Sequence, residues 1–206
     1  MKLNPEDLDD QSTYRHILTI SYNELVPFVM EYIGRRTWLT MAFWTFVLLL
    51  AGLAINIRIN IIGLYHLKTI ILHSIAGYVL FPLLAIPVHE FLHVIPYFLS
   101  GARNIRIGMD LRQYIFYVTA HRQVTDQALF TIVALTPFII ISVGCILLYF
   151  VLPGLWKWSI AVFFFVHTTM CAGDFALLNF YLVNKGKKIY TWDDVDLKEA
   201  YFYQEL

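Results

Sequence analysis

Charged residues are scarce in this chain of 206 residues, and neither sign of charge is in excess. Lysine, arginine, aspartate and glutamate together make up 15% of the residues, whereas hydrophobic residues make up 59%. The 15 basic and 15 acidic residues give a formal net charge of zero. This balance excludes an electrostatic surface for nucleic acid or for an acidic partner. The apolar excess is typical of an integral membrane protein.

Cysteine is also rare, because the chain has only Cys145 and Cys171, and both lie in apolar runs. Two such residues form neither a disulfide framework nor a CxxC metal knuckle, so we interpret them as small buried hydrophobic residues. The first ten residues, MKLNPEDLDD, are too acidic and too poor in apolar side chains for a secretory signal. We therefore expect the chain to be inserted into a membrane by its own spans.

Four apolar stretches are long enough to cross a hydrocarbon core, which needs roughly 20 apolar residues in a helix. They cover residues 39–55, 69–99, 127–152 and 156–183. No Gly/Ser-rich linker, low-complexity tract or internal repeat divides them, which favours one compact membrane domain. We predict a membrane domain over residues 39–184, an N-terminal segment over 1–38 and a C-terminal tail over 185–206.

Two shorter patterns lie outside these stretches. The segment from Ser21 to Glu24 has the form of a capping box and predicts a short amphipathic helix over residues 22–35. Between the second and third stretches, apolar and polar residues alternate over residues 105–112 and are followed by the run YIFYV, which predicts a β-hairpin. The predicted fold is thus an all-α integral membrane protein with about four transmembrane helices and a short membrane-adjacent hairpin.

The distribution of basic residues predicts the orientation, since cytoplasmic loops are enriched in lysine and arginine. One side of the predicted topology holds Arg35, Arg36, Arg103, Arg106, Arg112, Arg122, Lys185, Lys187 and Lys188. The other side holds Arg58, Lys68 and Lys157. We therefore expect a multi-pass protein of the cell membrane, in contact with lipid, with both termini in the cytoplasm.

The segment IPVHEFLHVIPYF places two histidines and a glutamate inside the second apolar stretch. On a helix, His89 and His93 lie four residues apart on one face and can bind the same Zn²⁺, while Glu90 lies close enough to act on water beside the ion. The alternative is a chance HxxxH pattern with a glutamate that reaches the interface. An ionisable residue at the centre of a membrane helix costs about 2.5 to 3.5 kcal/mol, which favours a functional role.

A catalytic zinc normally has three protein ligands, so a third must come from elsewhere in the chain. Asp174 is the obvious candidate, because it is the only carboxylate between Asp126 and the tail. A helical rise of 1.5 Å per residue places Asp174 at a depth similar to that of His89, and places His167 about 10 Å further out. We also expect Gly173 to let a neighbouring helix approach closely. His167 is kept as the alternative ligand.

Three segments resemble a known family, the zincin peptidases of the DUF3267 type, which look related to the site-2-protease class of intramembrane metalloproteases. These segments are HEFLH at 89–93, TAHRQVTDQALFTIVALTPF at 119–138 and AGD at 172–174. The resemblance implies His89 and His93 as metal ligands, Glu90 as catalytic base and Asp174 as third ligand. In the site-2 class a glycine follows the aspartate, whereas here Gly173 precedes it and Phe175 follows it.

These observations favour a zinc-dependent membrane peptidase that acts on peptide or membrane-protein substrates, in which Glu90 accepts a proton from water. His121 and His167 are candidates for a second group that stabilises the oxyanion, and the exposed edge of the hairpin could hold an extended substrate. Two other interpretations stay open. One is a non-enzymatic transporter or accessory protein with a metal or proton site, and the other is a zincin that retains its metal without hydrolysis.

Overall fold

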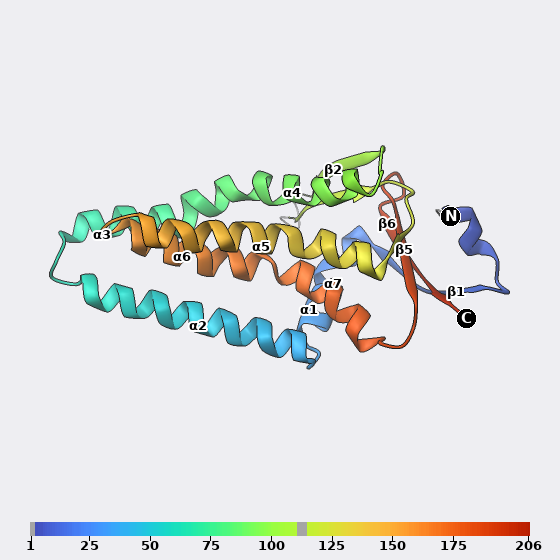
Figure 1. Cartoon of the computed structure of the whole chain (residues 1–206), viewed down its shortest axis with the longest axis horizontal. Helices are drawn as coiled ribbons and strands as arrows, with labels where there is room; N and C mark the ends of the chain where they lie inside the picture. The colour runs from blue at the N-terminus through green and yellow to red at the C-terminus, as the bar shows by residue number, and fades with distance from the viewer. Residues whose placement is uncertain (1–2, 111–114) are drawn as a thin grey trace.

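A computed structural model describes residues 3–110 and 115–206. It is an elongated bundle of long helices that run side by side, with a small β-sheet at one end (Figure 1). Both termini lie at the sheet end, because the helices cross the length of the molecule four times. The opposite end carries only the two turns that join α2 to α3 and α5 to α6 (Figure 1).

The four predicted apolar stretches are helical, as expected. Most ends of the long helices lie within a few residues of the predicted ends. The α-helices are α1 (Leu25–Gly34), α2 (Trp38–Ile61), α3 (Leu67–Ile75), α4 (Phe81–Leu99), α5 (Gln127–Val151), α6 (Trp156–Met170) and α7 (Ala172–Val183). Single-turn helices lie at η1 (Pro5–Asp9) and η2 (Tyr22–Glu24). Among the described residues, three helical segments are long and apolar enough to cross a membrane, or four if the bent pair α6 and α7 counts as one span.

Two of the predicted spans are interrupted helices. In the second span, a π-helical turn, η3 (Ala76–Leu80), joins α3 to α4. Gly77 in this turn packs so closely on α6 that an added Cβ would lie 2.6 Å from the Ser159 carbonyl oxygen. In the fourth span, the helix breaks at Cys171, and α6 and α7 meet at an angle of 43°.

The all-α prediction is wrong, because a four-stranded antiparallel sheet closes one end of the bundle. Its strands are β1 (Tyr14–Ser21), β4 (Thr125–Asp126), β5 (Ile189–Asp194) and β6 (Glu199–Glu205), in the order β1-β6-β5-β4. The N-terminal segment therefore pairs with the C-terminal tail, Ser21 opposite Glu199 and Tyr14 opposite Glu205. Aromatic and β-branched residues in IYTWDD and EAYFYQE are the sequence signal for these strands.

The predicted hairpin is present, with β2 (Ile105–Asp110) antiparallel to β3 (Ile115–Ala120) and Ile105 opposite Ala120. Leu111 and Arg112 of the predicted alternation and Tyr114 of the predicted YIFYV run lie outside the described residues. The predicted capping box differs in detail. The Ser21 hydroxyl accepts a hydrogen bond from the Asn23 N–H and caps η2, and α1 follows directly.

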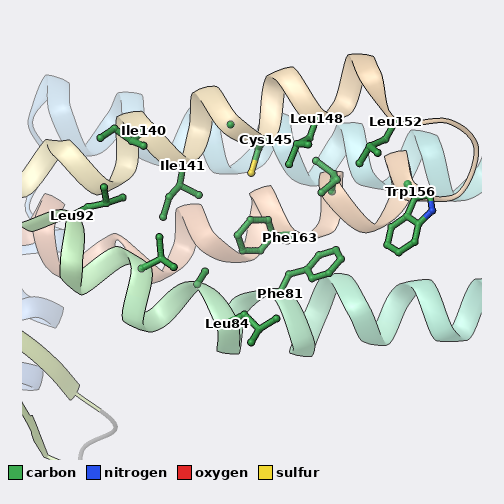
Figure 2. Close-up of a pocket in the computed structure, with 14 residues that line it drawn as sticks. Phe81, Leu84, Leu92, Ile140, Ile141, Cys145, Leu148, Leu152, Trp156 and Phe163 are labelled. Atoms are coloured by element: carbon green, nitrogen blue, oxygen red, sulfur yellow. The ribbon is translucent and has the colours of Figure 1, made fainter.

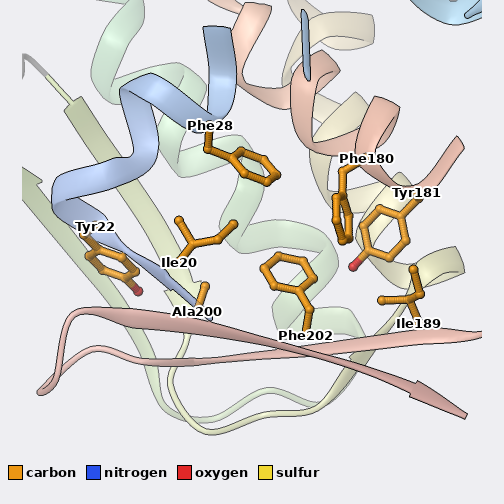
Figure 3. Close-up of a cluster of buried hydrophobic side chains, with 8 residues drawn as sticks. All are labelled: Ile20, Tyr22, Phe28, Phe180, Tyr181, Ile189, Ala200 and Phe202. Carbon is orange, nitrogen blue, oxygen red and sulfur yellow. The ribbon is translucent and has the colours of Figure 1, made fainter. Parts of the chain in front are cut away.

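The sheet is joined to the helices by a cluster of buried aromatic and aliphatic side chains (Figure 3). Phe28 from α1, Phe180 and Tyr181 from α7, and Phe202 from β6 meet there. Each such side chain stabilises the fold by about 1.5 to 3 kcal/mol through burial. Asn179, which is fully buried on α7, donates to the carbonyl oxygens of residues 32 and 35 at the end of α1 (2.6 and 2.9 Å). These contacts fix α7 relative to the sheet.

Candidate metal centre

The two histidines of the HExxH segment and Asp174 come together at the inner face of the bundle. His89 and His93 lie one turn apart on α4, and both imidazoles are buried. The Nε2 atom of His89 lies 3.3 Å from Asp174 Oδ2, and the Nε2 atom of His93 lies 3.6 Å from Asp174 Oδ1. Two imidazole nitrogens thus face one carboxylate, which is the arrangement expected of three ligands around a small cation.

Pro137 explains how the His93 ring is oriented. A proline has no backbone N–H, so the carbonyl four residues earlier in the helix, that of Val133, lacks its usual donor. His93 Nδ1 lies 2.9 Å from this carbonyl oxygen and donates to it. The hydrogen bond places the proton of a neutral imidazole on Nδ1 and leaves the Nε2 lone pair directed at Asp174.

His167 orients the other histidine. Its Nε2 atom lies 3.2 Å from His89 Nδ1, on the side of the His89 ring opposite Asp174. If His89 offers Nε2 to a cation, its Nδ1 carries the proton and donates to His167. His167 is completely buried and lies closer to the site than the depth argument predicts, because it contacts the His89 ring directly.

Asp174 lies in the first turn of α7, just after the break at Cys171. The N-terminal end of a helix favours a negative charge, so this position stabilises the ionised carboxylate. The expectation that Gly173 allows close helix packing is wrong. An added Cβ on Gly173 would meet no atom within 4 Å, and this residue instead lines a cavity.

Glu90 completes the group, since ligand atoms of His89, Glu90 and His93 all lie within 4.8 Å of one another. Its side chain is half-buried and lines the same cavity as Asp174. A second group that meets the same criterion consists of His89, His167 and Cys171. Its histidine nitrogens already contact each other, and the carboxylate lies on the other side of His89.

The cavity beside these residues has a volume of about 510 Å³. Its walls come from α4, α5 and α7 on the bundle side and from α1, β3, β5 and β6 on the sheet side. Tyr117 and Thr119 of the hairpin and Asp193 of β5 face it together with Glu90 and Asp174. The polar groups of the bundle therefore face a space large enough for a stretch of peptide.

A second cavity of about 620 Å³ lies further along the bundle, between α4, α5 and α6 (Figure 2). Phe81, Leu84, Leu148 and Phe163 are among its lining residues, and the single sulfur is that of Cys145. No histidine or carboxylate among the described residues lines it. This groove therefore offers no group for acid–base chemistry.

The remaining histidines of interest have structural partners. His121 Nδ1 accepts from the Val195 N–H (3.1 Å), so a neutral ring carries its proton on Nε2, 3.6 Å from Asp196. This leaves no lone pair for a metal, although His121, Asp194 and Asp196 lie close together. His73 contacts the Ser159 hydroxyl (2.9 Å) and thus lies at the interface between α3 and α6.

Comparison with protein families adds one match. The family model DUF3267, described as "Putative zincin peptidase", matches residues 82–190, which is more than half of the chain. The matched region contains HEFLH, the hairpin, α5, α6, α7 and the start of β5. The match does not extend the resemblance to the site-2-protease class. Neither the curated proteins nor the solved structures gave a match to this chain.

Proposed function

The chain belongs to the family described as "Putative zincin peptidase", and we propose that it is a zinc-dependent peptidase embedded in a membrane. One observation carries the proposal: the Nε2 atoms of His89 and His93 lie 3.3 and 3.6 Å from the two oxygens of Asp174. Imidazole and carboxylate ligands in a set of three are typical of catalytic zinc sites.

His89, His93 and Asp174 are the residues that would hold the ion. The donor set suits zinc, since it combines two neutral imidazoles whose other nitrogens are hydrogen-bonded with one carboxylate at a helix N-terminus. When bound, zinc acts as a Lewis acid that polarises a carbonyl group and acidifies water. The three ligands would therefore supply the first requirement of peptide hydrolysis, which is activation of the carbonyl group and of water.

Glu90 supplies the second requirement, a general base. Its carboxylate accepts a proton from the water that adds to the peptide carbonyl carbon, and then delivers this proton to the leaving amine as the C–N bond breaks. His89 and His93 are committed to Asp174, Val133 and His167. Glu90 is thus the group of the HExxH segment that remains available for proton transfer.

The membrane setting rests on the outer surface of the bundle, where large apolar side chains such as Leu48, Leu83 and Phe150 are exposed. The candidate site lies toward the end of the bundle that carries the sheet. A peptide would reach this cavity from the membrane surface or from the end of a membrane segment. We therefore propose membrane proteins or membrane-proximal peptides as substrates.

An ion-transport role fits the structure less well. A proton or ion path requires polar groups at successive depths of a membrane protein. In the described part of the long helices, the acidic residues and three of the histidines gather at one depth, whereas His73 is paired with Ser159. The groove along the rest of the bundle is apolar.

Metal analysis tests the ligand set. We expect about one zinc per chain in the purified wild type and a strong loss in His93→Ala and Asp174→Ala. His167→Ala should retain most of the metal, because His167 contacts the nitrogen of His89 that faces away from Asp174. Equal, near-zero zinc in the wild type and in His93→Ala would refute the site, and loss in His167→Ala alone would transfer the ligand role to His167.

The Glu90→Gln variant tests the catalytic assignment. The amide preserves the shape of the side chain but cannot accept the proton, so zinc should remain while hydrolysis falls by at least 10²-fold, a typical contribution of a general base. Peptide cleavage followed by mass spectrometry gives the rate. Cleavage at the wild-type rate would show that Glu90 is not the base.

A further inference from the structure

The candidate catalytic cavity holds a third carboxylate that peptide hydrolysis does not require. Asp193 on β5 lines it from the sheet side, across from Glu90 and Asp174 on the bundle side. The Tyr22 hydroxyl donates to Asp193 Oδ1 (3.2 Å), and the Thr119 hydroxyl donates to Asp193 Oδ2 (2.6 Å). Two neutral donors thus fix the carboxylate without offsetting its charge.

Two basic side chains near the sheet are engaged elsewhere. Arg106 forms an ion pair with Asp196 (2.6 Å), and Arg122 forms ion pairs with Glu6 and Asp194. The nearby His121 ring accepts from the Val195 N–H at Nδ1, and its Nε2 faces Asp196 rather than Asp193. Among the described residues that line the cavity, none is lysine or arginine.

The charges inside the cavity therefore do not balance. Glu90, Asp174 and Asp193 provide three carboxylates when ionised, while a divalent cation at the histidines offsets two of them. Burial raises the pKa of Asp193, which means that its ionised form is less favourable here than in water. A cation delivered from outside the chain would offset this cost. Aromatic side chains such as Tyr117 and Phe130 line the same space and would pack against an aliphatic stem.

We propose that Asp193 is a specificity-determining residue that binds a basic side chain, lysine or arginine, of the peptide substrate. This inference rests on the proposed peptidase function and adds the substrate class. Tyr22 and Thr119 hold the carboxylate in place, so the charge-assisted hydrogen bond forms without reordering of the pocket. Substrates with an acidic side chain at this position are disfavoured by the same charge.

The test uses the zinc-loaded full chain in detergent and a peptide that the wild type cleaves, found by mass spectrometry of mixed synthetic peptides. Each position of that peptide is replaced in turn by lysine or by norleucine, which has the same stem without the charge. At one position we expect kcat/KM to be about tenfold higher for lysine. Asp193→Asn should bring this ratio close to one while cleavage of the norleucine peptide persists.

The matched control is Asp196→Asn, since Asp196 is an exposed carboxylate near the same strand that pairs with Arg106 outside the cavity. It should retain the lysine preference. A wild type that cleaves lysine and norleucine peptides equally at every position overturns the inference but leaves the peptidase function intact, whether or not Asp193→Asn folds.

If no peptide is cleaved, the proposed function fails. The affinities of lysine- and norleucine-containing peptides for the wild type, measured by fluorescence anisotropy, then decide the inference, and equal affinities overturn it.

Discussion

At the scale of single residues, the site depends on a backbone group that a proline leaves unpaired. Pro137 is fully buried in α5, and the carbonyl that it frees, at Val133, accepts from His93. Proline inside a helix normally costs about 3 kcal/mol. Here the cost is partly offset by a hydrogen bond that orients a candidate metal ligand.

Replacement of this proline gives the first prediction. Pro137→Ala restores an N–H that competes for the Val133 carbonyl, so His93 loses part of its orientation and zinc affinity should fall about tenfold. The thermal stability of the metal-free protein should not decrease, because alanine favours the helix. Chelator competition measures the affinity, and Ile139→Ala, an exposed position on the same helix, is the control. An unchanged zinc affinity in Pro137→Ala would contradict the role of the proline.

Asp193 gives the second prediction, on pH. Burial raises the pKa of this carboxyl above its value in an unfolded chain, which is about 3.9. The folded state therefore binds the proton more tightly, and the resulting stability is present below the unfolded pKa and is lost as the pH rises through the folded pKa. The hydrogen bonds from Thr119 and Tyr22 oppose this shift without reversing it.

The free energy of unfolding of the metal-free protein, measured at a series of pH values, tests the direction of this pH dependence. Asp193→Asn cannot ionise, so its stability relative to the wild type should increase as the pH rises from about 4 toward neutrality. A stability difference that does not change with pH would mean that the carboxyl titrates alike in the folded and unfolded states. Asp196→Asn, exposed and paired with Arg106, again serves as the control.

At the scale of elements, two interrupted helices, one at η3 and one at Cys171, determine where neighbouring helices approach each other. The π-helical turn η3 places Gly77 against α6, with Ser159 and Val162 next to the position that a Cβ would take. The break at Cys171 turns α7 toward the sheet and places Asp174 in its first turn. Both ligand-bearing helices, α4 and α7, thus follow directly after an irregular turn.

Two glycine substitutions test this packing with opposite signs. In Gly77→Ala the new Cβ would lie 2.6 Å from the Ser159 carbonyl oxygen, so we expect a loss of about 1 to 3 kcal/mol from overpacking. Gly144→Ala on α5 adds a Cβ with no atom within 4 Å and should stabilise the helix by about 0.5 to 1 kcal/mol. Thermal unfolding in detergent measures both. Equal effects in the two variants would show that the contact between η3 and α6 is not close.

At the scale of the whole molecule, the sequence could predict what is local and strongly periodic. The apolar stretches, the hairpin and the HExxH segment follow from patterns within about 30 residues. The four-stranded sheet could not be predicted as readily, because β1 and β6 come from opposite ends of the chain and each has only seven or eight residues. The tail also carries mixed charge, which conceals its aromatic and β-branched residues.

Within the candidate site, the same limit applies to tertiary contacts. The His89–His93 pair follows from helical spacing, and Asp174 follows from the scarcity of carboxylates in the spans. The role of His167 depends on its contact with His89 on another helix, and that of Asp193 depends on how the tail folds back over the cavity. The proline signal at residue 137 was visible in the sequence, but its partner His93 lies on another helix.

The arrangement of basic residues over the whole molecule leads to the final prediction, on membrane topology. Arg58, Lys68 and Lys157 lie at the turns remote from the sheet, whereas the other basic residues of the predicted loops that the structure describes lie at the sheet end. Since cytoplasmic loops are enriched in lysine and arginine, the sheet end should face the cytoplasm. The candidate site would then open toward the cytoplasmic side of the membrane.

Cysteine labelling in intact cells tests this orientation. Cys145 and Cys171 are buried, so the wild type should give little background. Arg103→Cys and Lys187→Cys at the exposed sheet end should react with a membrane-impermeant maleimide only after lysis, whereas Lys68→Cys should react in intact cells. The opposite pattern would place the sheet outside. Under the proposed function, the substrates would then have to be sought on the outer face, because the cavity lies at the sheet end of the bundle.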